Sequence, residues 1–143
     1  MTRMKYAMQT APKLLPADPF HQKLAIELSF TIMRGWALSD SEQFTLTGLK
    51  DAYIFQLWQQ RVFTELSKET YLRLACVIDV NRQLKLMGTT APSTVRWLKS
   101  NNPAFQDQSP LHHMLSHGLE GIQDVSRVLC QQAHYPLNTT QLH

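Results

Sequence analysis

The chain has 143 residues, a length that suits one compact domain or two small domains sharing a core. Hydrophobic residues make up 43% of it, which is ordinary for a soluble globular protein, and no apolar run approaches the roughly 18 residues that span a bilayer. Residues 1–10 lack the apolar centre of a secretory signal. We therefore expect a cytoplasmic protein with no membrane partner.

The net charge of +3 is too small to identify a nucleic-acid-binding protein, but its distribution is uneven. Residues 1–99 hold thirteen Lys and Arg against eight Asp and Glu, a balance of +5. Residues 100–143 hold one Arg against three acidic residues, a balance of −2. This division fits a DNA-facing front half joined to a protein-binding back half.

The front half shows a helical pattern after an irregular start. Residues 1–18 mix lysines, prolines and scattered apolar residues without a sustained period, so we expect a flexible arm there. A helix should begin at Pro19 and break near Gly35. Its apolar residues are too dense for a one-sided surface helix, which predicts that it is largely buried. These residues are Leu24, Ile26, Leu28, Phe30, Ile32 and Met33.

Two short helices joined through Gly48 should follow. The first should start at Ser39 or Asp40, whose side chains can cap it, with Glu42 in its first turn. The second should run over residues 50–60. These are the lengths of a helix-turn-helix, in which the second helix enters the major groove of DNA.

The second of these helices has distinct sides. Ile54, Leu57 and Trp58 should face the core, and the outer side should be polar. Glutamines can hydrogen-bond adenine edges, and Lys and Arg can meet phosphates. Two short helices around a glycine also occur in helical proteins that bind no DNA. The residues expected to contact DNA are Lys50, Asp51, Tyr53, Gln56, Gln59, Gln60 and Arg61.

The rest of the chain reads as further helices. Ser67 should cap a long helix that Gly88 ends. A helix over 92–99 should stop before Pro103, because the residue before a proline leaves the α region. After a turn with one aromatic residue, Phe105, helices should cover 110–117 and 119–132, separated by Gly118 and with Ser109 capping the first. No alternating pattern predicts a strand, so we expect an all-α protein.

The sequence offers little for catalysis. His113 and His117 have the spacing of a paired metal site, but no third ligand is evident, and we expect no metal. No glycine-rich phosphate loop, nucleophile elbow or Cys-x-x-Cys is present. Cys76 and Cys130 are expected to be buried free thiols, with a disulfide or a catalytic thiol as the alternatives. We expect core tryptophans at Trp36, Trp58 and Trp97, no cofactor, no catalytic residues and no small-molecule substrate: the chain should not be an enzyme.

A series of different short motifs extends along most of the chain. They are Arg34-Gly35-Trp36-Ala37-Leu38-Ser39, Glu42, Leu46-Thr47-Gly48, Trp58, Leu66-Ser67-Lys68-Glu69-Thr70, Arg73-Leu74, Trp97-Leu98, Asn102-Pro103, Phe105, Ser109-Pro110-Leu111, Met114-Leu115, Gly118 and residues 125–129. In order and spacing they resemble the antitoxins of the Xre/MbcA/ParS class, in particular the Xre-like antitoxins paired with RES-domain toxins. That class tends to carry glycines after the aromatic residue of the turn, where this chain has Gln106, Asp107 and Gln108, and an acidic residue where it has His112.

The resemblance implies an all-α, usually dimeric protein. An arm (1–18) would precede an Xre-like helix-turn-helix bundle (19–88), followed by a small helical domain for toxin binding and dimerisation with a C-terminal tail (89–143). Such antitoxins neutralise a neighbouring toxin by direct contact and commonly repress their own promoter. RES toxins degrade NAD, so the chain would protect the NAD pool.

The resemblance also implies that the C-terminal region contacts the toxin. The expected contact residues are Arg127, Gln131, His134, Tyr135, Leu137 and Leu142. A tail without this role is an equal alternative. Two other functions stay open: a free-standing helix-turn-helix transcription regulator, and a helical adaptor that binds no DNA.

Overall fold

The structure is a computed structural model that describes residues 19–134. The arm expected over 1–18 and the segment 135–143 lie outside the described residues, and so do the side chains of Ala133 and His134. The described part contains helices and no strand, which confirms the all-α prediction for it. In chain order the elements are α2 (Pro19–Gly35), α3 (Asp40–Thr47), α4 (Ala52–Gln59), α5 (Lys68–Leu86), α6 (Ala91–Lys99), a 3-10 turn η1 (Pro103–Phe105) and α7 (Pro110–His134).

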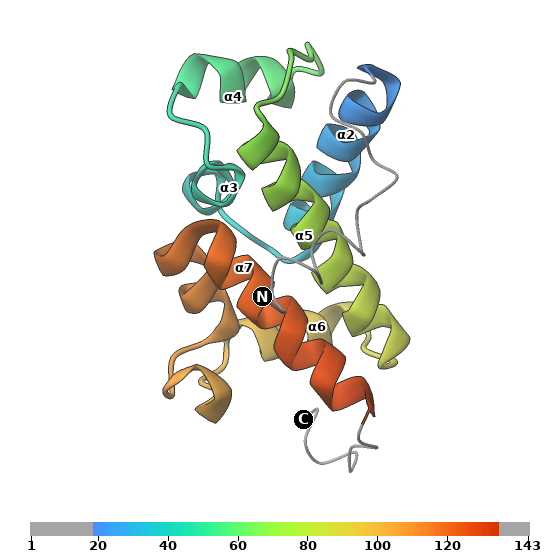
Figure 1. Cartoon of the computed structure of the whole chain (residues 1–143), viewed down its shortest axis with the longest axis vertical. Helices are drawn as coiled ribbons and strands as arrows, with labels where there is room; N and C mark the ends of the chain where they lie inside the picture. The colour runs from blue at the N-terminus through green and yellow to red at the C-terminus, as the bar shows by residue number, and fades with distance from the viewer. Residues whose placement is uncertain (1–18, 135–143) are drawn as a thin grey trace.

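Helix α5 is the central element of the molecule (Figure 1). It packs against α2 and against α7, while α3 and α6 each also contact α7. One continuous hydrophobic core results, to which both halves of the chain contribute. Its largest fully buried side chains include Trp36, Trp58, Tyr71, Leu84 and Leu98. Trp97 is also buried, so the three tryptophans belong to the core as predicted.

Most helix ends follow the signals read from the sequence. Ser39 and Glu42 form a reciprocal capping box on α3, and the hydroxyl of Ser67 accepts the backbone N–H of Thr70 at the start of α5. Gly48 ends α3 with a φ of 75°, a left-handed conformation that glycine adopts without strain. These contacts confirm the predicted order of the front helices.

The corner before α7 is also as expected. Asn102 and Pro103 stop α6, and the side chain of Asn102 accepts the backbone N–H of Ala104 at 3.0 Å. Phe105 is buried, and the hydroxyl of Ser109 accepts the N–H of His112 at 3.0 Å as the following helix begins. The corner therefore anchors the start of α7 to the core.

Helix α7 bends sharply at one glycine. The two expected helices are joined into one element, and Gly118 breaks it with φ 61° and ψ −145°. Gly121 follows on the inside of the bend, where a Cβ would lie 2.5 Å from the carbonyl oxygen of His113. Only a glycine allows the two halves of α7 to approach this closely.

Two expectations about burial are wrong. Helix α2 is not largely buried: Leu24 and Leu28 are exposed, and so is Phe20 ahead of them. A helix at the edge of a bundle buries only the side that a neighbour covers. Helix α4 turns Phe55 and Trp58 inward, whereas Ile54 and Leu57 are only half-buried.

Among residues 19–134, none of the helices combines the length and the apolar character that crossing a membrane requires.

Candidate functional site

The outward face of α4 is fixed by aromatic packing beneath it. The ring of Phe55 lies 5.5 Å from that of Phe30 on α2 and 5.3 Å from that of Phe44 on α3. Trp58 is buried one turn later, and its indole N–H donates to the hydroxyl of Thr64 at 2.9 Å. These contacts hold the opposite side of α4 in solvent.

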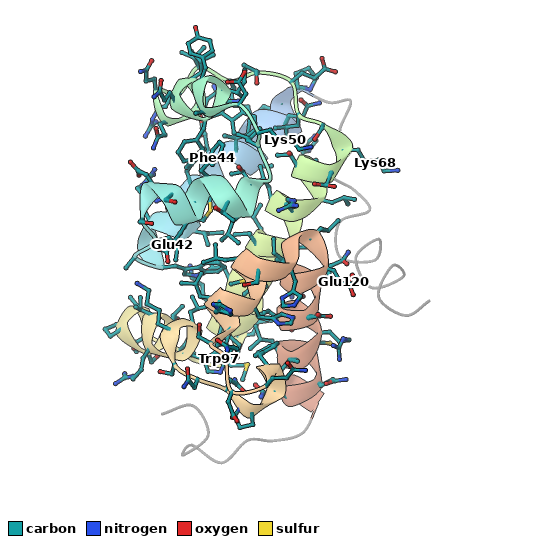
Figure 2. All side chains as sticks on the ribbon, turned by 90° about the vertical axis from the view of Figure 1, so that its left-hand side faces the viewer. Glu42, Phe44, Lys50, Lys68, Trp97 and Glu120 are labelled. Atoms are coloured by element: carbon teal, nitrogen blue, oxygen red, sulfur yellow. The ribbon has the colours of Figure 1, made fainter. Side chains whose placement is uncertain are left out.

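The seven residues predicted to contact DNA are all exposed. Tyr53, Gln56 and Gln60 follow one another at three- and four-residue intervals, so they share one face of the helix. Lys50 precedes the helix at the same end of the molecule (Figure 2). Together they form a polar surface with a basic residue at its start.

Two of these seven residues, Asp51 and Arg61, occupy structural positions at the ends of α4 that the sequence did not reveal. The carboxylate of Asp51 accepts the backbone N–H of Tyr53 at 2.9 Å, which makes Asp51 the N-cap of α4. The helix begins at Ala52 and not at residue 50. Arg61 leaves the helix in the left-handed region, with a φ of 65°, and with Arg34, Glu27 and Gln59 it lines a hollow between α2 and α4.

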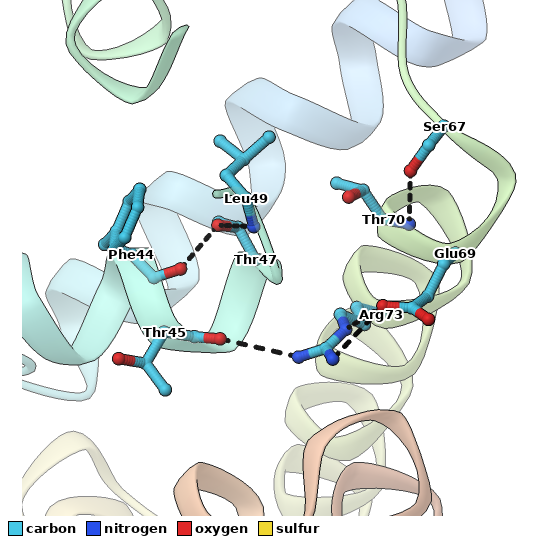
Figure 3. A network of polar contacts seen from close by, with 8 residues as sticks. All are labelled: Phe44, Thr45, Thr47, Leu49, Ser67, Glu69, Thr70 and Arg73. Carbon is cyan, nitrogen blue, oxygen red and sulfur yellow. Dashed lines mark hydrogen bonds and ion pairs between the residues drawn. The ribbon is translucent and has the colours of Figure 1, made fainter. Parts of the chain in front are cut away.

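The turn between α3 and α4 is closed by Thr47. Its hydroxyl donates to the carbonyl oxygen of Phe44 at 2.6 Å and accepts the N–H of Leu49 at 3.2 Å (Figure 3). This pair of bonds lies beside Gly48 and fixes the angle between the two short helices.

Arg73 of α5 joins the front half to α7. Its guanidinium pairs with Glu69, with its Nε 3.2 Å from Oε2, and reaches the carbonyl oxygen of Thr45 on α3 at 3.4 Å (Figure 3). The same side chain lies against two glycines: a Cβ on Gly48 would be 2.5 Å from its Nε, and one on Gly118 would be 3.0 Å from its Nη2. Arg73 thus occupies the space that the two glycines leave.

The bend of α7 is also braced by a polar pair. His113, before the bend, has its Nε2 2.9 Å from Oδ2 of Asp124, after it. The ring of Phe105 lies 5.0 Å from the ring of His113, and His117 stacks on His113 at 4.3 Å. Arg127 pairs with the other oxygen of Asp124 at 3.4 Å. Within residues 19–134 no three His, Cys, Asp or Glu residues form a group that could hold a metal ion.

The residues predicted to contact a toxin follow the same helix. Arg127 is half-buried and Gln131 is exposed, four residues apart on one side of α7, while the side chain of His134 lies outside the described part of the chain. Glu120 and Asp124 extend this side towards the bend. Tyr135, Leu137 and Leu142 lie outside the described residues. The sequence did not reveal that Glu120 belongs to this surface or that Asp124 pairs with His113 across the bend.

A buried polar cluster holds α7 against α5. Asp79 accepts hydrogen bonds from Ser126 of α7 and from Gln83 and Arg82 of α5. Burial, and then the nearby charge of Asp79, raises the pKa of Cys76 to about 12. Cys76 and Cys130 are not joined by a disulfide, which agrees with the prediction. The signal that could have revealed this cluster in the sequence is the carboxylate of Asp79 within the apolar stripe of a helix.

The C-terminal part of the described chain matches a known family model. Residues 85–134 fit the family model described as the antitoxin Xre/MbcA/ParS C-terminal toxin-binding domain. The matched range covers the end of α5, α6, the Phe105 corner and all of α7. Over these residues the chain is similar to the toxin-binding domain of the Xre/MbcA/ParS class of antitoxins, which supports the resemblance seen in the sequence and is consistent with a toxin as partner. Comparison with curated proteins and with solved structures gave no match.

Proposed function

We propose that the chain is an antitoxin that neutralises a RES-type, NAD-degrading toxin and represses its own promoter as a homodimer in the cytoplasm. The observation that carries the proposal is the family match over residues 85–134, because it assigns toxin binding to the part of the chain that contains α7. The chain acts by contact and not by catalysis. The functional division of the chain after residue 88 belongs to the same proposal.

The proposed toxin contact is the outward side of α7 together with the residues that follow it. Arg127, Gln131 and His134 form its helical part, and Tyr135, Leu137 and Leu142 continue it. Arg127 is oriented by its pair with Asp124, which reduces the entropy lost when it binds a partner. If the residues that follow α7 reach into the opening of the toxin's catalytic cleft, they exclude NAD from that cleft.

The first experiment expresses the product of the adjacent gene with and without this chain and measures cellular NAD. We expect NAD to fall with the toxin alone and to recover when the chain is present. Arg127→Glu and truncation after Gln132 should each weaken the recovery. Arg96→Glu, an exposed charge on α6, is the matched control. A toxic neighbour that leaves NAD unchanged would remove the RES assignment, and no toxic neighbour at all would favour the transcription regulator.

The proposed DNA contact is the polar face of α4. With Asp51 committed to the helix cap, Lys50, Tyr53, Gln56 and Gln60 are left to meet bases and phosphates, with Gln59 and Arg61 on the flank. A helix with so few positive charges should bind weakly from a single copy and more strongly from two.

The second experiment measures binding of the upstream DNA at two salt concentrations. Combined Lys50→Ala and Gln56→Ala substitutions should abolish the shift while leaving NAD protection intact. The control is Lys99→Ala, whose ammonium group contacts the carbonyl oxygen of Ala37 away from α4. If the wild-type chain does not bind the upstream DNA at low salt, it is an antitoxin without autorepression.

A further inference from the structure

A hollow of about 90 Å³ lies between α2 and the end of α4. Glu27, Thr31 and Arg34 line it from α2, and Gln59 and Arg61 line it from the end of α4. On this measure a single water needs roughly 10–15 Å³. The hollow therefore has room for several waters or for one tetrahedral anion.

The two arginines of the hollow lack an acidic partner. The three arginines of α5 and α7 each pair with a carboxylate, but within residues 19–134 neither Arg34 nor Arg61 does so. Glu27 lines the same hollow without forming an ion pair with either guanidinium among these residues. Guanidinium groups match the geometry of phosphate oxygens and bind them through charge-assisted hydrogen bonds. The hollow thus offers two such groups that no protein anion neutralises.

Arg61 occupies a position where helices commonly carry glycine. Its N–H donates to the carbonyl oxygen of Trp58 at 3.0 Å, and the N–H of Val62 donates to that of Leu57 at 2.8 Å. This pair of bonds closes a helix end through one left-handed residue, here Arg61 with a φ of 65°. A residue with a Cβ is disfavoured there, so the arginine costs folding free energy that a glycine would not. Strain of this kind at a hollow points to a use for the side chain that lines it.

We propose that Arg34 and Arg61 together bind one phosphate group in this hollow, which we call the phosphate site. The hydroxyl of Thr31 accepts from Nη2 of Arg34 at 3.5 Å, which restricts that guanidinium before a ligand arrives. The site borders the polar face of α4, because Gln59 follows Gln56 by three residues.

The phosphate can come from two sources with the same chemistry. A phosphodiester of DNA lying on α4 would fix the register of the duplex, and this source deepens the proposed DNA contact and rests on it. Free phosphate is the other source and does not depend on the proposed function. The two arms of the experiment separate these sources.

The first arm titrates the full-length chain with inorganic phosphate and follows the tryptophan indole N–H signals by NMR. Trp58 lines the hollow, so its signal should shift and reach saturation, while those of Trp36 and Trp97 should not move. Sodium chloride at equal ionic strength should leave all three signals in place.

Charge substitutions then locate the bound phosphate. Arg34→Gln and Arg61→Gln should each raise the dissociation constant for phosphate about tenfold. Arg96→Gln is the matched control, because it removes the same charge from an exposed position on α6, away from α4 (Figure 1). Glu27→Gln should lower the dissociation constant about threefold, since it removes a negative charge from the hollow.

Arg61→Gly separates phosphate binding from folding. Glycine relieves the left-handed backbone, so the midpoint of urea unfolding should rise while phosphate binding is lost. A structural role of the arginine side chain would lower both together. Circular dichroism verifies that the other variants fold.

The second arm measures the affinity for the upstream DNA and for an unrelated duplex over a range of salt concentrations. A phosphate contact reads no bases, so Arg34→Gln and Arg61→Gln should weaken both duplexes by the same factor, about tenfold. The double variant should lose less than the product of the single losses, because both guanidiniums hold one phosphate. It should also lower the slope of log affinity against log salt by about one.

The outcomes divide clearly. Loss of DNA affinity assigns the site to a phosphodiester, and saturable phosphate binding with unchanged DNA affinity assigns it to free phosphate; both support the inference. The inference is overturned if neither arm distinguishes Arg34→Gln and Arg61→Gln from Arg96→Gln, or if the double variant loses the full product. If the wild-type chain binds no upstream DNA, the proposed autorepression fails, while the first arm still decides the phosphate site.

Discussion

His113 and Asp124 clasp the two halves of α7 across the bend at Gly118, with Nε2 and Oδ2 2.9 Å apart. Eleven residues separate them, so no regular helix could bring them together. Both side chains are mostly buried, at 18% and 14% exposed. The clasp fixes the direction in which the second half of α7 presents Arg127 and Gln131.

The clasp predicts an energetic coupling. His113→Ala, Asp124→Ala and the double variant should give a coupling energy of about 0.5–1.5 kcal/mol in urea unfolding, as for a typical intramolecular hydrogen bond. The cycle is needed because Asp124 also pairs with Arg127. Strictly additive losses would mean that the contact contributes nothing. His112→Ala, an exposed neighbour, should be nearly neutral.

Gly118→Ala should destabilise the fold by about 1–3 kcal/mol. The backbone angles of Gly118, φ 61° and ψ −145°, are close to a region that only glycine populates, and a Cβ would meet the Nη2 of Arg73 at 3.0 Å. Gly35→Ala is the matched control because its Cβ would lie in open space. Thermal or urea unfolding of both variants makes the comparison, and equal stabilities would contradict the strained bend.

Gln106→Gly should stabilise the protein by up to about 1 kcal/mol. Gln106 has a φ of 57°, and left-handed backbone disfavours residues with a Cβ. Asp107 follows with a φ of 64°. A glycine would adopt this left-handed backbone without strain. Gln108→Gly is the control, since Gln108 has no positive φ and should only lose stability; the midpoints of urea unfolding give the sign.

Cys76 should be unreactive in the folded chain. With its pKa at about 12, only roughly one molecule in ten thousand carries a thiolate there at pH 8, and the side chain is buried. Raising the pH from 7 to 9 keeps this thiol protonated. Labelling with iodoacetamide followed by mass spectrometry should modify Cys76 only after unfolding, while the half-buried Cys130 reacts earlier. Fast labelling of native Cys76 would show that α5 opens.

Much of the helix order could be predicted from the sequence because caps and glycines act locally. Ser39, Ser67 and Gly48 each end or begin a helix through contacts within a few residues. The inward side of α4 could not be predicted in the same way. Ile54, Leu57 and Phe55 are all apolar, and only the rings of Phe30 and Phe44 decide which of them is buried.

The candidate sites show the same limit. The polar face of α4 and the outward side of α7 follow from helical spacing, and the described residues expected there are exposed or half-buried; their contacts with DNA and with a toxin stay predictions. The clasp at Asp124 and the cluster at Asp79 depend on bends and crossings between helices, which a single sequence does not reveal. Leu24 and Leu28 of α2 were expected in the core but are exposed, because apolar content alone does not say which side of a helix has a neighbour.

The central position of α5 links the fate of both surfaces. The helix packs against α2 and α3 in the front half and against α7 in the back half, so neither half retains its packing without it. A single cut in this one helix would therefore remove the support of the front helices and of α7 in the same event, so the two candidate surfaces could not be lost one at a time.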